Sequence, residues 1–189
     1  MEQIPHKLMM RNINELIGII NGISYDGIIN KLEVAGLSSW VKKNRNLSYE
    51  PRQARLISLV EQVLEDGIIT DEEREILIDN CSEYTALETD SSAKIYELNG
   101  IIEGVISDNE INEKEVCHLQ EWMRTNASFI RDHKPSKIIC EKIDQILEDD
   151  IVTQAEQESL LEKEIKPCAD RNENRVLKNL CQRKKKSRY

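Results

Sequence analysis

Aromatic residues, glycine and proline are all scarce in this chain of 189 residues, which has two Trp, five Tyr, one Phe, seven Gly and four Pro. β-Sandwiches, collagen-like chains and low-complexity chains need Gly/Pro-rich turns or aromatic and β-branched strands, so this composition excludes them. Hydrophobic residues make up 39% of the chain, too many for a disordered protein. No apolar run approaches the roughly 18 residues of a membrane span, and we expect neither a transmembrane helix nor a secretory signal.

The five cysteines form no CxxC pair. An odd number of cysteines without that spacing argues against a disulfide framework and a zinc site, and it suits a reducing, cytoplasmic location. The positions are Cys81, Cys117, Cys140, Cys168 and Cys181.

Catalytic motifs are also missing. The chain contains no GxxxxGK[ST] or GxGxxG phosphate loop, no HExxH and no GxSxG, and its three histidines lie far apart in the sequence. We therefore predict that the protein is not an enzyme and has no cofactor, apart from weak divalent-metal binding considered below.

Charge is unevenly distributed. The formal net charge is −9, but residues 170–189 carry eight basic and two acidic residues, which leaves −15 on residues 1–169. An acidic body repels phosphates, so nucleic-acid binding is expected, if anywhere, only at the basic tail.

An internal repeat with a period of about 41 dominates the chain. Four short segments at nearly even spacing begin with an aspartate. Each aspartate is followed by a glutamate seven positions later and by a leucine four positions after that. The aspartates are Asp26, Asp66, Asp108 and Asp149, and the glutamates are Glu33, Glu73, Glu115 and Glu156.

Each unit is predicted to be helix, tight turn, helix. A helix N-cap residue precedes every repeat glutamate by three positions, as in a capping box; these residues are Asn30, Thr70, Asn112 and Thr153. The aspartate and the Gly, Asn or Asp after it tolerate the left-handed conformation that ends the preceding helix. Apolar residues upstream recur at helical spacing.

Alternate units match best. Residues 16–44 and 98–126 share 13 identities over 29 positions, at an offset of 82. The sequence therefore predicts an all-α fold built by tandem duplication of a four-helix unit of two helix-turn-helix repeats. We expect a first lobe at 1–88, a second lobe at 89–167 and a basic C-terminal helix or tail at 168–189.

Four of the seven glycines form Gly18-x-x-x-Gly22 and its counterpart Gly100-x-x-x-Gly104. Glycine inside a helix costs about 1 kcal/mol relative to Ala, so an offsetting benefit is expected. We predict close approach of two helices, within a lobe or between subunits, and we favour packing inside one chain.

The turns resemble the second half of an EF-hand loop, but the oxygen ligands expected four and two residues before each aspartate are mostly missing. Canonical Ca²⁺ binding is therefore not expected. By analogy with paired EF-hands, we predict β-like contacts between Ile29 and Ile69 and between Ile111 and Val152. Weak Mg²⁺ or Mn²⁺ binding by the repeat aspartates and glutamates remains open; this set is Asp26, Glu33, Asp66, Glu73, Asp108, Glu115, Asp149 and Glu156.

The repeated Asp-Gly-x-Ile-x-x-x-Glu turn after an apolar helix resembles the TerB-like family of tellurite-resistance-associated helical domains. The run from Leu98 to Trp122 is also similar to a helical module that precedes BRCT domains in some bacterial proteins. The resemblance covers about residues 12–165 and implies an accessory or interaction domain of stress-response and phage-defence settings, rather than a catalyst.

The leading hypothesis is therefore a non-enzymatic adaptor, scaffold or regulatory module that binds another protein. Trp40 and Trp122 lie on the expected core-facing stripe, yet either is also a candidate anchor for a partner. The basic cluster is the other candidate contact; its residues are Arg183, Lys184, Lys185 and Lys186. The alternatives are a divalent-metal-binding module of TerB type and an acidic, DNA-mimicking inhibitor of a nucleic-acid enzyme.

Overall fold

A computed structural model of the chain describes residues 6–45, 50–85, 91–108, 111–132, 137 and 141. The described part is all-helical, as predicted, and contains no strand. Its seven helices are α1 (His6–Ile23), α2 (Lys31–Asn44), α3 (Pro51–Val63), α4 (Asp71–Thr85), α5 (Ser91–Val105), α6 (Glu113–Thr125) and α7 (Ala127–Asp132). Among these residues, no helix has both the length and the apolar character that crossing a membrane requires.

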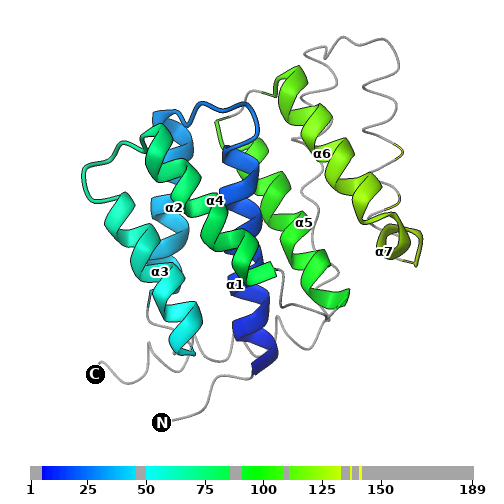
Figure 1. The fold of residues 1–189 in the computed structure, drawn as a ribbon, viewed down its shortest axis with the longest axis horizontal. Coiled ribbons are helices and arrows are strands. Elements are labelled where there is room, and N and C mark those ends of the chain that lie inside the picture. Colours follow the sequence, from blue (N-terminus) through cyan, green and yellow to red (C-terminus); the bar gives the residue numbers. More distant parts are fainter. Residues whose placement is uncertain are drawn as a thin grey trace, which may run out of the picture.

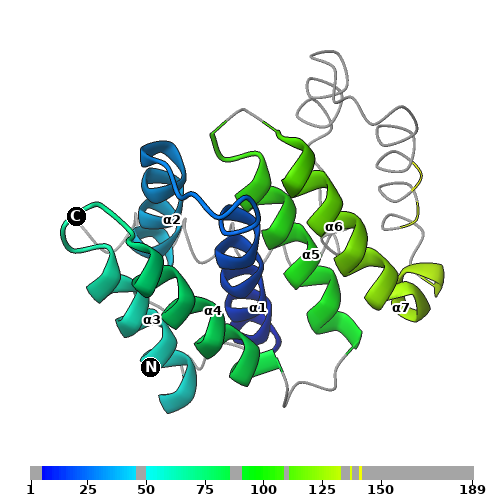
Figure 2. The same ribbon diagram turned by 45° about the horizontal axis from the view of Figure 1, so that its top comes forward.

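Helices α1 and α5 lie side by side in the middle of the molecule, with α2, α3 and α4 on one side and α6 and α7 on the other (Figures 1 and 2). The turns that follow α1, α3 and α5, beginning at residues 24, 64 and 106, lie at the same end of the bundle, called here the turn end (Figure 1). The boundary expected at residues 88/89 and the one at 167/168 both lie outside the described residues.

The core divides into two hydrophobic clusters. The larger is built from α1 to α4 and the turn before α4, with Leu16, Ile20 and Leu77 fully buried. The smaller is built from α5 and α6 around Leu98 and Ile101, and Phe129 of α7 packs against it. This division parallels the two predicted lobes, but the fourth turn, at 149–153, lies outside the described residues, and the duplication of a whole four-helix unit stays a prediction.

The glycine pairs bring α1 and α5 into backbone contact. A Cβ atom on Gly18 would stand 2.1 Å from the Glu97 carbonyl oxygen, and one on Gly100 would stand 2.0 Å from the Glu15 carbonyl oxygen. Gly18 faces Gly100 and Gly22 faces Gly104, so the two helices run parallel. Only glycine fits there, which explains why the helices carry residues of low helix propensity.

The predicted role of these glycines in close packing is thus confirmed, and the contact is intramolecular, as favoured; the expectation of a contact within one lobe is wrong. The contact joins α1, assigned to the first predicted lobe, to α5, assigned to the second, inside one chain. The reason is that each lobe carries the same small-residue face, so the two aligned copies fit each other.

Candidate interaction surface

The turns are closed by the aspartate and glycine of the repeat. The Asp26 carboxylate accepts the Ile28 amide at 2.8 Å, and the Asp66 carboxylate accepts the Ile68 amide at 2.9 Å. The glycines that follow these aspartates adopt left-handed φ angles of 88° and 78°. Glycine adopts this conformation without the strain that most side chains would meet, so the predicted left-handed residue after each aspartate is confirmed at both places. The helices themselves end four residues earlier, at Ile23 and Val63.

Capping boxes begin the three helices that follow these turns. The Asn30 side-chain oxygen accepts the Leu32 and Glu33 amides, and the Glu33 carboxylate accepts the Asn30 backbone amide at 2.6 Å. The same reciprocal pairs join Thr70 with Glu73 and Asn112 with Glu115. Three of the four predicted boxes are therefore present, and the fourth, at Thr153, lies outside the described residues.

The repeat carboxylates thus hold turns and helix starts. Within the described ranges, no group of three or more His, Cys, Asp or Glu residues is arranged to hold a metal ion. Asp149 and Glu156 of the proposed ligand set lie outside those ranges.

Asparagine side chains join the first turn to the third. The Asn30 side-chain amide donates to the Asp108 carboxylate at 2.7 Å, and the Asn112 side-chain amide donates to the Asp26 carboxylate at 3.3 Å. In each bond the repeat asparagine of one turn donates to the repeat aspartate of the other turn. They close the top of the α1–α5 pair, directly beyond the glycines.

This arrangement concentrates negative charge between α2 and α6. Burial raises the pKa of Glu33 to about 7, against the opposing effect of the Asn30 amide, and the charges of Asp108 and Asp26 raise it further. Glu115 also has a pKa raised to about 7, with burial again the largest cause. A buried carboxyl near other carboxylates favours its protonated form, so Glu33 and Glu115 take up protons more readily than free glutamate side chains do.

The predicted β-like contact between Ile29 and Ile69 is wrong. Both side chains reach the larger core cluster, but no backbone hydrogen bond joins the two turns among the described residues. The Arg74 guanidinium, in the first turn of α4, donates instead to the Gly27 carbonyl oxygen of the first turn. The predicted β-like contact between Ile111 and Val152 stays a prediction, because Val152 lies outside the described residues.

Four large apolar side chains are exposed on the described part of the chain: Ile28 at 69%, Ile68 at 60%, Leu32 at 57% and Ile76 at 47%. The first three lie in the turns or the first turn of α2. Ile28 and Ile68 occupy the same repeat position, and in each turn the next isoleucine faces the core. The outward isoleucine is therefore not required by the turn itself.

Acidic residues are close in sequence to these apolar side chains. Asp26 lies beside Ile28 in the first turn, Asp66 and Glu65 precede Ile68 in the second, and Asp71 and Glu72 begin α4. An apolar group rimmed by charge is typical of a surface that another protein covers.

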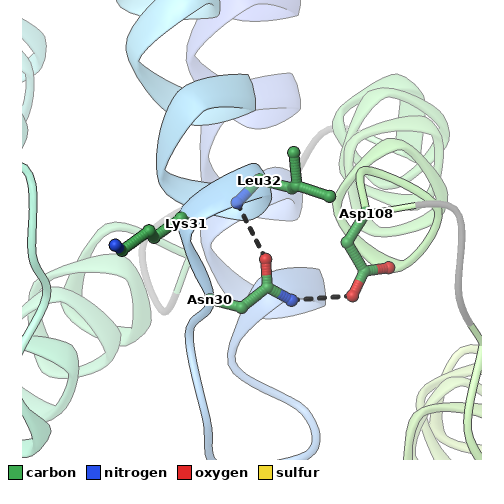
Figure 3. Close-up of a pocket in the computed structure, with 4 residues that line it drawn as sticks. All are labelled: Asn30, Lys31, Leu32 and Asp108. Atoms are coloured by element: carbon green, nitrogen blue, oxygen red, sulfur yellow. Dashed lines mark hydrogen bonds between the residues drawn. The ribbon is translucent and has the colours of Figure 1, made fainter.

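A pocket of about 360 Å³ opens beside this surface. It is lined by Asn30, Lys31, Leu32 and Asp108, and so lies between the start of α2 and the turn after α5 (Figure 3). The Asn30 side chain spans it, accepting the Leu32 amide at 2.9 Å and donating to Asp108.

Both tryptophans take the core-facing position. The Trp40 side chain is 6% exposed, and its indole N–H donates to Glu15 at 3.3 Å. Trp122 packs against the smaller cluster, and its indole N–H donates to Glu97 at 3.0 Å. Trp40 thus offers a partner little surface, Trp122 is half-buried, and a partner contact at either stays a prediction. Arg183 to Lys186 lie outside the described residues.

The sequence reasoning missed the exposed apolar residues. One signal was available for Leu32, because the equivalent positions of the second and third units hold Glu72 and Lys114. An apolar residue at a position that is charged in other copies of the repeat marks a side chain that helix packing does not require.

Comparison with protein-family models, with curated proteins and with solved structures finds no match to this chain. The TerB-like assignment therefore rests on the repeat motif alone.

Proposed function

We propose that this protein is a non-enzymatic interaction module, an adaptor, scaffold or regulator, that binds another protein through its turn end. The observation that carries the proposal is that three large apolar side chains, Ile28, Leu32 and Ile68, are more than half exposed at the turn end. Large apolar side chains left in water at sites the fold does not require are typical of binding surfaces. The biological setting, bacterial or phage stress response, defence or DNA metabolism, follows only from the TerB-like resemblance.

The geometry favours a partner with a basic surface around an apolar centre. The apolar side chains would supply most of the binding free energy, and the surrounding carboxylates would steer association and select charge. Binding is therefore expected to weaken as salt is added.

Affinity capture from the native cell tests this proposal. The full-length chain is expected to retain a stoichiometric partner, and the double variant Ile28→Ser/Ile68→Ser is expected to lose it. Both isoleucines are more than half exposed, so the variant should fold normally.

Ile76→Ser is the matched control, because Ile76 is an exposed isoleucine on α4 outside the turns. Equal capture by the double variant and the parent chain would disprove the role of the turn end. A truncation to residues 1–169 shows in the same experiment whether the basic tail contributes to binding.

A further inference from the structure

The second turn is the acidic side of the turn end. Residues 65–72 carry four carboxylates and no basic side chain. Among the described residues, the one ion pair that these carboxylates make joins Asp71 to Arg74 at 3.7 Å. The lysines of this end, Lys31 and Lys114, lie instead at the starts of α2 and α6. Three of the four carboxylates therefore have no basic partner in the described part of the chain.

Two exposed isoleucines adjoin this charge. Ile68 belongs to the same segment and is 60% exposed, and Ile28 of the first turn is 69% exposed. The Arg74 guanidinium donates to the Gly27 carbonyl oxygen, so the start of α4 touches the first turn next to Ile28. This surface thus combines large apolar side chains with negative charge. Its best occupant is a segment with apolar residues, several cations and few acids.

The chain itself contains a segment of that composition, outside the described residues. Residues 175–186 include six basic and no acidic residues. Val176, Leu177 and Leu180 occur among them, at a spacing typical of one face of a helix. By contrast, residues 133–169 include nine acidic and five basic residues, and like charge disfavours that stretch as the occupant.

We propose that residues 175–186 cover the turn end of the same molecule and that the partner protein binds by displacing them. The apolar residues of the segment would cover Ile28 and Ile68, and its basic side chains would face the carboxylates of residues 65–72. A partner with a basic surface around an apolar centre competes for these same contacts. This inference rests on the proposed function and names how its surface is regulated.

The length of chain before the segment permits this contact. Residues 133–174 separate it from the end of α7 at Asp132. At about 3.3 Å per residue such a stretch reaches up to roughly 140 Å, about ten times the radius of gyration of a domain of this size. A flexible tether also gives the segment an effective concentration on the order of 1 mM. Contacts of about millimolar affinity would therefore cover the surface roughly half of the time.

Trypsin cleavage of the full-length chain within residues 183–186 is the direct test, because a covered segment is cleaved only when it opens. The double variants Ile28→Ser/Ile68→Ser and Glu65→Gln/Glu72→Gln should both be cleaved there about fivefold faster than the parent chain. The first removes apolar contacts, and the second removes exposed charges that make no ion pair among the described residues. Intact-mass spectrometry measures the initial rates.

Two matched controls carry the same kinds of substitution outside the turns. Ile76→Ser removes an exposed isoleucine of α4, and Asp79→Asn/Glu83→Gln removes two exposed charges further along the same helix. Both should be cleaved at the rate of the parent chain. Circular dichroism checks that every variant keeps its helices.

Partner capture tests the regulation. The full-length variant Arg183→Gln/Lys184→Gln/Lys185→Gln/Lys186→Gln should retain more partner than the parent chain when the chain is limiting, because apparent affinity rises with the uncovered fraction. If these residues instead contact the partner directly, the same variant should retain less.

The inference is overturned if cleavage is equally fast in the parent and both double variants, or if the glutamine variant retains less partner. Protection that rises with chain concentration would place the segment on a second copy and would also overturn it. A partner lost from Ile28→Ser/Ile68→Ser, with cleavage unchanged, would refute the covering segment and support the proposed function. A partner retained by that variant would refute the proposed function itself.

Discussion

The α1–α2 pair and the α5–α6 pair make the same internal contacts and present different surfaces. In both, an indole N–H donates to a glutamate 25 positions earlier, at Glu15 and Glu97. In both, an asparagine four positions after the tryptophan donates to its carbonyl oxygen. They differ where each turn meets the second helix of the other pair. Stacked rings and a lysine join the first turn to α6, whereas small residues face each other between the third turn and α2, which carries a leucine in place of the lysine.

This comparison separates residues that hold the fold from residues free to serve binding. Contacts that recur at both paired positions are those the helix pair needs to form. Features present on one side alone, such as the pocket at Leu32, are not required by that architecture and are therefore the better candidates for function.

The largest expected effect comes from breaking the contact that the two pairs share. A Cβ atom on Gly100 would stand 2.9 Å from the Gly18 Cα atom and closer still to the Glu15 carbonyl oxygen. Gly100→Ala should therefore destabilise the chain by about 3 kcal/mol, because backbone atoms would have to move apart. Urea unfolding followed by circular dichroism measures it.

Gly36→Ala is the matched control on a helix surface. Its Cβ atom would meet only the Ser107 Cβ atom, at an ordinary 3.5 Å, so alanine should stabilise α2 by about 0.5–1 kcal/mol. The free energy of unfolding should therefore fall in Gly100→Ala and rise in Gly36→Ala. Similar effects would mean that α1 and α5 do not meet through their backbones.

These glycines also show how much of the fold can be predicted from the sequence. Capping boxes and left-handed turn glycines act over a short stretch of chain, so the repeat predicted the boxes correctly at Asn30, Thr70 and Asn112. The GxxxG pattern predicted that two helices meet closely, but a local pattern does not specify which helices, and the α1–α5 pairing was missed.

The candidate surface was less predictable, because it also depends on which distant segments of the chain meet. The pocket depends on Leu32 of α2 lying opposite Asp108, which belongs to a turn far along the chain. The analogy with EF-hands failed at Ile29 and Ile69, because it assumed a pairing of the first two turns, whereas the asparagine–aspartate contacts at this end join the first turn to the third.

A smaller effect should distinguish the two tryptophan–glutamate contacts. Glu97 has a side chain 6% exposed and also pairs with Lys94 at 2.6 Å, whereas the Glu15 side chain is 23% exposed and lies 3.8 Å from Arg11. Glu97→Ala should cost about 2 kcal/mol, since it leaves a lysine and an indole N–H without their acceptor. Glu15→Ala should cost about 1 kcal/mol, because water reaches the site and replaces the lost acceptor.

Thermal unfolding and tryptophan fluorescence of both variants measure this difference. Glu97→Gln keeps an acceptor for the indole and should recover part of the loss. Equal costs for the two alanine variants would show that the contacts are energetically alike despite their different burial.

A pH dependence of the free energy of unfolding is also expected. Glu33 and Glu115 have pKa values of about 7 in the folded chain against 4.5 for the free side chain, so the folded state binds more protons between these values. Stability from these two groups should therefore decrease as the pH rises from about 4.5 to about 7.

Urea unfolding at pH 5, 6, 7 and 8 measures the slope. The double variant Glu33→Gln/Glu115→Gln should flatten it, because glutamine keeps an acceptor for each helix start without titrating. A slope that persists unchanged in this variant would assign the proton uptake to other groups.

The parallel pairing of α1 with α5 also has a consequence for synthesis. Residue 23 ends α1 and residue 105 ends α5, so a ribosome working at about 5–20 residues per second takes roughly 4–16 s to complete the second helix after the first. During that interval the glycine face of α1 has no mate in its own chain, while neighbouring nascent chains on the same messenger carry an identical face. The order and density of translation therefore help to decide whether one chain or two close around this helix pair.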